Sequence, residues 1–308
     1  MKSKEKLICV VGSSIVDFTI RLPKLPNLGE TILGNLEEIN LGGKGANQAV
    51  GLARLGSNVV FVTCLGNDNY SHSFKEKFRN EKIIDCISIS ETKLTGLGIP
   101  LLLESGENTI IVSPGAALEL TPYEAEKCFE RYNNISALLI QFEIPEQTIL
   151  TSLRKARSKG ITTIVNPAPV MIYGKDFLQY TDILILNKYE VENLSGIKVN
   201  LIDSAFQAAN VIKKYGVKIV IVTLGKEGLI ALTNSEKFSL SSVKIDVADT
   251  TGAGDAFCAG FTHGITEGMS VRDALIFANS CAAICCSKIG ALPAMPYKED
   301  VVRLLQKG

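Results

Sequence analysis

Short, continuously apolar runs with high β-propensity recur along the chain, separated by stretches long enough for a helix. Strands that are apolar on both faces are typical of a parallel sheet with helices over both faces. We therefore predict an α/β fold built on a mostly parallel central sheet. The runs are LICVVG (7–12), NVVFVTCLG (58–66), ALLIQFE (137–143), TTIVNPAP (162–169), DILILN (182–187) and KIVIVTLG (218–225).

Two segments interrupt this alternation. Residues 17–43 and 95–116 lack a helical period but contain strand-like stretches between Pro, Gly and Asn turns, and residues 104–108 suit the turn of a hairpin. Insertions beside a scaffold often close over a ligand, so we interpret the pair as a small β-rich lid within a single domain spanning residues 1–308. Two ordinary surface excursions are the alternative.

The balance of charges gives no long-range attraction for a polyanion. Lys and Arg together number 32, as do Asp and Glu, so no net field favours nucleic acid or an anionic membrane surface. The amino-terminal MKSKEKLICVVG lacks an apolar segment of signal-peptide length, and no apolar run approaches the roughly 18 residues of a membrane span. We expect a cytoplasmic protein with neither a nucleic-acid nor a membrane partner.

The eight cysteines are expected to be reduced residues of the core. Most lie inside apolar runs such as LICVVG and FVTCLG, and no C-x-x-C pair occurs. The two histidines, His72 and His263, are far apart in the sequence. This spacing does not suit a zinc or redox site.

The stretch DTTGAGDAF (249–257) joins a strand-like run to a helix-like one through two glycines. Gly252 and Gly254 permit a tight turn that exposes consecutive N–H groups at a helix start, where the helix dipole also attracts an anion. A phosphoryl group or other oxyanion is the natural ligand. Asp255 would repel this ligand unless it takes a proton from an attacking hydroxyl. A simple helix cap by Asp255 is the alternative.

Other phosphate-binding motifs do not fit. GAGDAF lacks the third glycine of the dinucleotide fingerprint and an acid about 20 residues later. GGKGAN and LGKEG contain Gly-Lys but lack the earlier glycine and the following Ser or Thr of a P-loop. Phosphate is therefore expected to bind by another route.

Polar residues that suit a polyol occur where the lid-like segment enters the first predicted helix and after two strands. GGKGAN supplies Gly43 and the donors Lys44 and Asn47, while Asp17 and Glu143 add acceptors. Open α/β sheets bind ligands at the carboxyl ends of their strands, so one pocket is predicted. Each residue also has an ordinary explanation as a solvated charge, turn residue or loop carboxylate.

Two further motifs, NKYE and TLGKEG, each follow a predicted strand. Asn187 and Glu190 offer an amide and a carboxylate suited to phosphate and hydrated Mg²⁺, with a plain helix cap by Asn187 as the alternative. Thr223 and the open backbone at Gly225 and Gly228 suit contact with a nucleotide, although glycines are common in any such turn.

In order and spacing, GGKGANQA, NPAP, NKYE, TLGKEG and DTTGAGDAF resemble the ribokinase family of PfkB-type carbohydrate kinases over essentially the whole chain. The resemblance implies a Rossmann-like, three-layer α/β domain with a small β-sheet lid that often joins two protomers, hence a homodimer. It also implies ATP-dependent phosphorylation of D-ribose at O5, giving ribose 5-phosphate, with Mg²⁺ and an activating monovalent cation, normally K⁺.

The resemblance further implies roles for individual residues. Asp255 would be the catalytic base, and the N–H groups of Gly252, Ala253 and Gly254 would form the anion hole for the transferred phosphoryl group. The other implied positions are Asp17, Gly43, Lys44, Asn47, Glu143 and Asp255 for the sugar; Asn187, Thr223, Gly225, Lys226, Gly228, Gly254 and Asn279 for ATP; Glu190 for Mg²⁺ through water; and Asp249, Thr251, Cys285, Lys288 and Gly290 for K⁺, partly through backbone carbonyls.

Two residues depart from the family pattern. Ile15 stands where some ribokinases have Asn, which removes a polar sugar contact and leaves the preference between ribose and 2-deoxyribose open. Ala294 stands where ribokinases usually place a Ser hydroxyl against the cation. This change predicts weaker K⁺ activation or a water in place of the hydroxyl.

Two alternative functions stay open: a kinase for 2-deoxyribose, another sugar or a nucleoside, and a sugar or nucleotide sensor without catalysis. GGKGANQA and an aromatic content of 6% with no Trp argue against a nucleoside, which would call for more stacking side chains. Asp255, Lys44 and Glu190 argue against a sensor, which has no need of a base aimed at a transferred group.

Overall fold

The computed structural model describes residues 6–105, 108–169 and 174–306. Its main sheet has the strand order β13-β12-β11-β10-β9-β8-β1-β4-β5. The apolar runs predicted as strands form β1 (Leu7–Val11), β4 (Asn58–Gly66), β8 (Ile135–Gln141), β9 (Thr162–Asn166), β10 (Ile183–Asn187) and β11 (Ile219–Thr223). These strands and β5 (Ile84–Ser90) pair in parallel, whereas β12 (Leu229–Leu232) and β13 (Lys237–Leu240) are antiparallel. The predicted α/β fold is confirmed.

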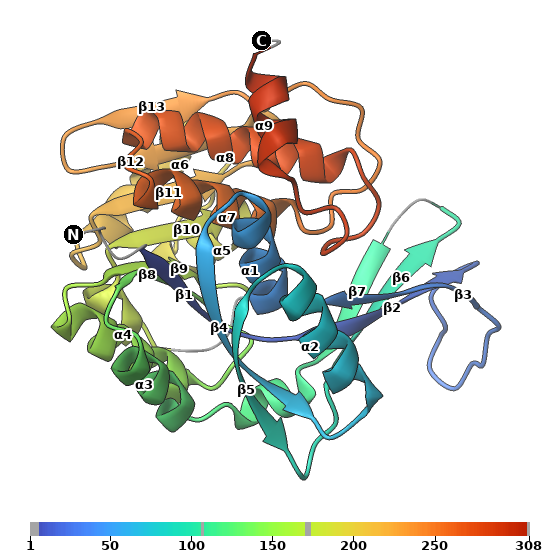
Figure 1. Cartoon of the computed structure of the whole chain (residues 1–308). Coiled ribbons are helices and arrows are strands. Elements are labelled where there is room, and N and C mark those ends of the chain that lie inside the picture. Colours follow the sequence, from blue (N-terminus) through green and yellow to red (C-terminus); the bar gives the residue numbers. More distant parts are fainter. Residues whose placement is uncertain (1–5, 106–107, 170–173, 307–308) are drawn as a thin grey trace.

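Helices cover both faces of the main sheet (Figure 1). Along the strands, alternate side chains enter two separate cores, so that Val10 and Phe61 pack on one face while Cys9 and Val60 pack on the other. One face carries α1 (Lys44–Arg54), α2 (Asn69–Asn80), α7 (Ala253–Thr266), α8 (Val271–Cys286) and α9 (Lys298–Leu305), and the other carries α3 (Pro122–Arg131), α4 (Glu146–Ser158), α5 (Lys188–Ser195) and α6 (Ile202–Lys213).

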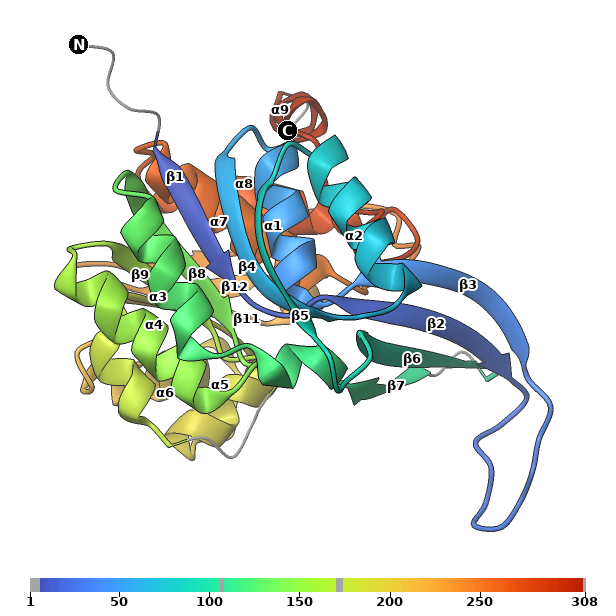
Figure 2. The ribbon, with the colours of Figure 1, turned by 60° about the horizontal axis from the view of Figure 1, so that its bottom comes forward.

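A second, four-stranded sheet has the order β3-β2-β6-β7. It extends sideways from the main body, and the chain between β2 and β3 protrudes furthest (Figure 2). The segments predicted as β-rich supply its strands, β2 (Ile15–Leu22), β3 (Asn35–Gly42), β6 (Gly96–Leu103) and β7 (Asn108–Ser113). The predicted small sheet is therefore confirmed, with β6 and β7 as a hairpin; residues 106–107 of its turn lie outside the described residues.

The cysteines behave as the sequence predicts, since all are free thiols and only Cys86 and Cys286 are more than slightly exposed. Within the described ranges, no group of three or more His, Cys, Asp or Glu side chains is arranged to hold a metal ion. No helix in that part of the chain combines the length and apolar character needed to cross a bilayer.

Candidate active site

Helix α7 begins in the DTTGAGDAF turn, with Gly252 as its N-cap in the left-handed region at φ 80°. A side chain at Gly252 would be strained by this φ, and its Cβ would also lie 2.9 Å from the Cα of Ala291. A Cβ at Gly254, by contrast, would meet no atom within 4 Å. The helix start is therefore rigidly supported on one side and open on the other, as an anion-binding turn requires.

Asp255 is the third residue of α7 and is 6% exposed. Its Oδ2 accepts a hydrogen bond from Asn47 Nδ2 at 2.9 Å, and its Oδ1 accepts one from Gln48 Nε2, also at 2.9 Å. Gln141 Nε2 in turn donates to Gln48 Oε1 at 2.6 Å. Gly252 is the N-cap, so the alternative that Asp255 caps the helix is wrong. Two amides of α1 instead fix the direction of its carboxylate.

The side-chain amide of Asn47 uses its nitrogen but not its oxygen in hydrogen bonds to the described residues. Its Oδ1 is buried and has no hydrogen-bond partner among the described residues, while its Nδ2 contacts Asp255. A buried acceptor of this kind normally has a partner, so its position beside the candidate base suits a hydroxyl of a ligand.

A cavity of about 100 Å³ lies next to Asp255, where α1, α5 and α7 begin. It brings together predicted residues from motifs that are far apart in the sequence, together with Asn166 of NPAP, which was not predicted. It is lined by Lys44, Asn166, Ala168, Ile185, Leu186, Asn187, Glu190, Thr223, Gly252, Gly254, Asp255 and Cys258.

Asp17 lies on β2, in the middle of the small sheet, between neighbours on β3 and β6. A Cβ at Gly42 or at Gly98 would clash with its carboxylate oxygens. The two glycines therefore leave space for Asp17 in the sheet. Ile15, on the same strand, is 2% exposed and places apolar atoms beside Gly98. The role of Gly98 could not be predicted, because the strand register that pairs it with Asp17 is a long-range feature.

Glu143 follows β8 and is held at the start of α1. It accepts hydrogen bonds from Ser13 Oγ and, at 3.0 Å, from the backbone N–H of Lys44. Burial raises the pKa of Glu143, against the opposing effects of Lys44 and Ser13. Burial also raises the pKa of Asp17 to about 7, helped by the charges of Glu143 and Asp255.

Lys44 is a cation near several of these carboxylates. Burial would lower the pKa of its ammonium group, but Asp255, Glu143 and Glu190 outweigh burial and raise it. Lys44 therefore stays protonated, as a donor to a sugar hydroxyl or a phosphate must be.

Asn187 and Glu190 form a capping box at the start of α5. Asn187 Oδ1 accepts from the Glu190 N–H at 2.8 Å, and the Glu190 carboxylate accepts from Asn187 N and Nδ2, each at 2.8 Å. The helix-cap alternative is thus correct for Asn187, and its contact with ATP stays a prediction. Glu190 is 4% exposed and borders the cavity, and burial raises its pKa.

The remaining residues predicted to bind the nucleotide lie at the end of β11, in the turn that follows it and on α8. Thr223 borders the cavity and donates to Leu186 O at 3.3 Å, whereas Asn279 of α8 donates to Ser241 O at 2.8 Å. Gly225 and Gly228 have φ values of 60° and 92° around a short 3₁₀ turn that contains Lys226. Of all seven residues predicted to bind ATP, the cavity lining includes only Asn187, Thr223 and Gly254.

Most of the residues predicted to bind the monovalent cation are linked by hydrogen bonds next to the α7 turn. Asp249 accepts from Thr251 N and Oγ1 at 2.9 and 2.7 Å and from Gly290 N at 2.9 Å. Cys285 Sγ donates to Thr251 O at 3.5 Å. Burial would raise the pKa of Asp249, but these hydrogen bonds lower it, so the group is anionic. Lys288 instead pairs with Asp300 at 3.5 Å, which leaves only its backbone for the cation.

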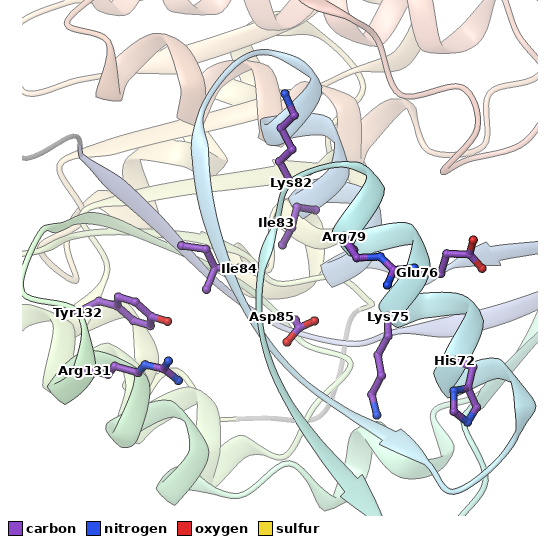
Figure 3. Close-up of a pocket in the computed structure, with 10 residues that line it drawn as sticks. All are labelled: His72, Lys75, Glu76, Arg79, Lys82, Ile83, Ile84, Asp85, Arg131 and Tyr132. Carbon is purple, nitrogen blue, oxygen red and sulfur yellow. The ribbon is translucent and has the colours of Figure 1, made fainter.

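A larger cavity lies elsewhere, between α2, the start of β5 and the end of α3, with a volume of about 770 Å³. Figure 3 shows side chains of α2 on one side of β5 and those of Arg131 and Tyr132 on the other. Its lining mixes both signs of charge and includes none of the predicted site residues. The lining residues are His72, Lys75, Glu76, Arg79, Lys82, Ile83, Ile84, Asp85, Arg131 and Tyr132.

Comparisons with known proteins identify the family of this chain. The pattern of the pfkB family carbohydrate kinases matches residues 5–298. The chain is 32% identical to ribokinase of Haemophilus influenzae, over 98% of this chain and 99% of that protein, and 31% identical to ribokinase of Mus musculus, over 97% and 93%.

Solved structures give the same result. The structure of Arabidopsis thaliana ribokinase complexed with ribose and ATP is similar, with a TM-score of 0.90 and 31% identity over 98% of this chain and 99% of that chain. Ribokinase from Thermotoga maritima superposes with a TM-score of 0.87 at 34% identity, over 98% and 99%. The family pattern, the relatives and the fold agree over nearly the whole length, and the chain belongs to the pfkB family of carbohydrate kinases.

Proposed function

We propose that this protein is a ribokinase, which transfers the γ-phosphoryl group of ATP to O5 of D-ribose and gives ribose 5-phosphate. The observation that carries the proposal is the carboxylate of Asp255, held by Asn47 and Gln48, directly beside the open turn at Gly254. A base that lies next to an anion site is what attack by a hydroxyl on a phosphoryl group requires. Ribokinases among the relatives support ribose as the acceptor.

The sugar would lie between the small sheet and the start of α1. Asp17 and Glu143 accept hydrogen bonds from its hydroxyl groups, and Lys44 and Asn47 lie where they contact its oxygens. Asp255 takes the proton from O5 as the oxygen attacks phosphorus and the bond to the ADP oxygen breaks. The N–H groups of Gly252, Ala253 and Gly254 stabilise the charge that develops on the phosphoryl oxygens.

The nucleotide and its Mg²⁺ would occupy the side of the cavity formed by Asn187, Glu190 and Thr223. The buried carboxylate of Glu190 at the cavity fits Mg²⁺, which is normally held by phosphates, water and one or two carboxylates. Mg²⁺ neutralises phosphate charge when it is bound, and Glu190 would orient its water. Gly225, Lys226, Gly228 and Asn279 would contact the rest of ATP.

A monovalent cation would lie below the turn, near Asp249, Thr251, Cys285, Gly290 and the backbone of Lys288. The anionic Asp249 fits such a site, but its two oxygens already accept three hydrogen bonds, so carbonyl groups would supply most ligands. We expect K⁺ to raise the rate above that in Na⁺ only moderately, because Ala294 has no hydroxyl. A comparison of turnover in the two salts at equal ionic strength tests this; equal rates would contradict a K⁺ site.

We further propose that residues 1–308 form one catalytic domain and that the small sheet is its lid. Large apolar side chains on β3 and β7 are exposed, which supports dimerisation through this sheet. They are Leu36, Ile39, Ile110, Ile111 and Val112, each between 44% and 57% exposed. An ATP-dependent reaction and reduced cysteines suit a cytoplasmic enzyme.

A kinase for 2-deoxyribose is the second candidate. Ile15, buried beside Asp17 and Gly98, offers no hydrogen bond to a hydroxyl at that position. A sugar without the C2 hydroxyl would leave no unpaired polar group against this side chain. The relative rates with the two pentoses therefore decide between the candidates.

The test is ADP release with Mg·ATP and K⁺, comparing D-ribose, 2-deoxyribose, fructose and adenosine. The variant is Asp255→Asn, and the matched control is Asp273→Asn, since Asp273 is also the third residue of its helix but lies in solvent. We expect ribose-dependent turnover that is lost in the first variant and kept in the second. Sugar binding without turnover in the wild-type protein would point to a sensor instead.

A further inference from the structure

Helix α1 ends at Arg54, whose side chain is 5% exposed and contacts a distant part of the chain. Its Nη1 donates to the carbonyl oxygens of Leu292, Pro293 and Met295 at 3.3, 3.1 and 2.8 Å. Three carbonyls from four consecutive residues thus meet one nitrogen atom. This contact fixes the path of residues 290–295, called the 290–295 segment below.

The other side of the guanidinium group is fixed as well. Arg54 Nε and Nη2 donate to Glu81 Oε1 at 3.0 and 2.9 Å, and Lys77 Nζ lies 2.8 Å from the same oxygen. The guanidinium carbon lies 4.7 Å from the centre of the Tyr297 ring. Burial would raise the pKa of Glu81, but Arg54 and Lys77 lower it. The planar group is therefore held in one orientation, which a lysine could not reproduce.

The 290–295 segment supports the α7 turn. A Cβ at Gly252 would lie 2.9 Å from both the Cα and Cβ of Ala291 and 3.1 Å from Met295 Cε, so these two residues pack directly against the turn. Met295 is fully buried and its sulfur also lies beside Gly51 of α1. At its other end, the segment is tied to Asp249 through Gly290 N. The turn therefore rests on a segment that is anchored at both ends.

We propose that Arg54 is a positioning residue for phosphoryl transfer, which acts through the 290–295 segment to hold the N–H groups of the Gly252 turn in place. The inference rests on the proposed role of that turn as the anion hole. Arg54 contacts neither Asp17 nor Lys44, which belong to the sugar side of the site. Its loss therefore changes the chemical step more than sugar binding.

Arg54→Lys and Arg54→Ala test the inference. Misplacing the turn should lower kcat by about 10 to 100-fold while the KM for the sugar stays within about threefold. Guanidinium chloride at tens of millimolar, against the same concentration of added NaCl at constant KCl, should restore part of the kcat of Arg54→Ala. The matched control is Arg157→Ala, since Arg157 also lies in the last turn of a helix and donates to a carbonyl, Gln179 O, at 2.7 Å.

Hydrogen–deuterium exchange on the protein without ligands gives a readout that does not depend on turnover. In Arg54→Lys, amides of the 290–295 segment and of residues 249–255 should both exchange faster than in the wild-type protein. Faster exchange in the segment alone would overturn the inference, because the turn would then be held independently. An unchanged kcat per folded molecule, judged by circular dichroism, would overturn it too. If Arg54→Ala does not fold, Arg54→Lys decides.

The experiment separates this inference from the proposed function. Failure of the wild-type protein to release ADP with any sugar would reject the proposed function, whatever Arg54 does. Normal wild-type turnover with an unchanged kcat in Arg54→Lys would reject only the positioning role.

Discussion

Asp17 should make the fold less stable as the pH rises, and Asp17→Asn should remove this effect. Burial, together with Glu143 and Asp255, raises its pKa from 3.8 to about 7. Between these values the folded protein holds a proton that the unfolded chain has released, so the unfolded state binds fewer protons and stability falls as the pH increases. The loss of stability is complete above about pH 7, and below pH 3.8, the pKa in the unfolded chain, Asp17 no longer affects stability.

The magnitude follows from the size of the shift. Each pKa unit corresponds to about 1.4 kcal/mol, so a shift of about 3 units destabilises the wild-type protein by up to about 4 kcal/mol at pH 8. At pH 5 most of this penalty has not yet developed. The stability of Asp17→Asn relative to the wild-type protein should therefore rise by about 2 to 3 kcal/mol between pH 5 and pH 8.

Urea unfolding at the two pH values measures this difference. Far-UV circular dichroism is the suitable probe, since the chain has no Trp. The control is Asp203→Asn, whose carboxylate lies in solvent in the first turn of α6. The reasoning is refuted if the difference between Asp17→Asn and the wild-type protein is the same at both pH values. The variant should also bind ribose more weakly, because it loses a charged acceptor.

Three further predictions follow from individual contacts. Gly98→Ala should raise the KM for ribose at least tenfold with little change in the KM for ATP, because the new Cβ displaces Asp17; an unchanged sugar KM in steady-state assays would contradict this. Gly252→Ala should lower kcat and destabilise the fold by about 1 to 3 kcal/mol, because alanine is strained at this left-handed φ and its Cβ clashes with Ala291. An unchanged melting temperature in thermal unfolding would contradict this prediction. Burial lowers the pKa of His263 to about 4. Between pH 6.5 and pH 4 the unfolded chain therefore binds a proton that the folded protein does not, and the free energy of unfolding should fall as the pH drops. His263→Gln should make this free energy depend less on pH in urea unfolding, and an equal pH dependence in the variant and the wild-type protein would contradict the prediction.

Much of the architecture could be predicted from local patterns. The strands that are apolar on both faces could only be buried between helices, and this property is visible in each run by itself. The turn at Gly252 was also predictable, because glycine spacing and the following helix are local features. The strands β5, β12 and β13 were not among the predicted strands, and Asn187 turned out to cap α5 with Glu190.

The candidate site was predicted in part for the same reason. Asp255, Lys44 and Glu190 stand out because each belongs to a compact motif beside a predicted strand or helix. Gln48 could not be assigned a partner, although it lies in GGKGANQA, because its contact with Asp255 spans 207 residues. Nor does any local pattern connect Arg54 with the carbonyl groups of the 290–295 segment.

The sequence by itself determined the six apolar strands of the main sheet, the position of the glycine turn at Gly252 and which side chains suit the predicted chemistry. These properties follow from the period of apolar residues and the backbone freedom of glycine, which act over a few residues. Only the tertiary structure decided that Gly98 makes room for Asp17, that two amides of α1 aim Asp255, and that Arg54 supports the turn. Such partners are chosen by the packing of whole elements against one another, and a single stretch of sequence carries no record of which surface it will meet.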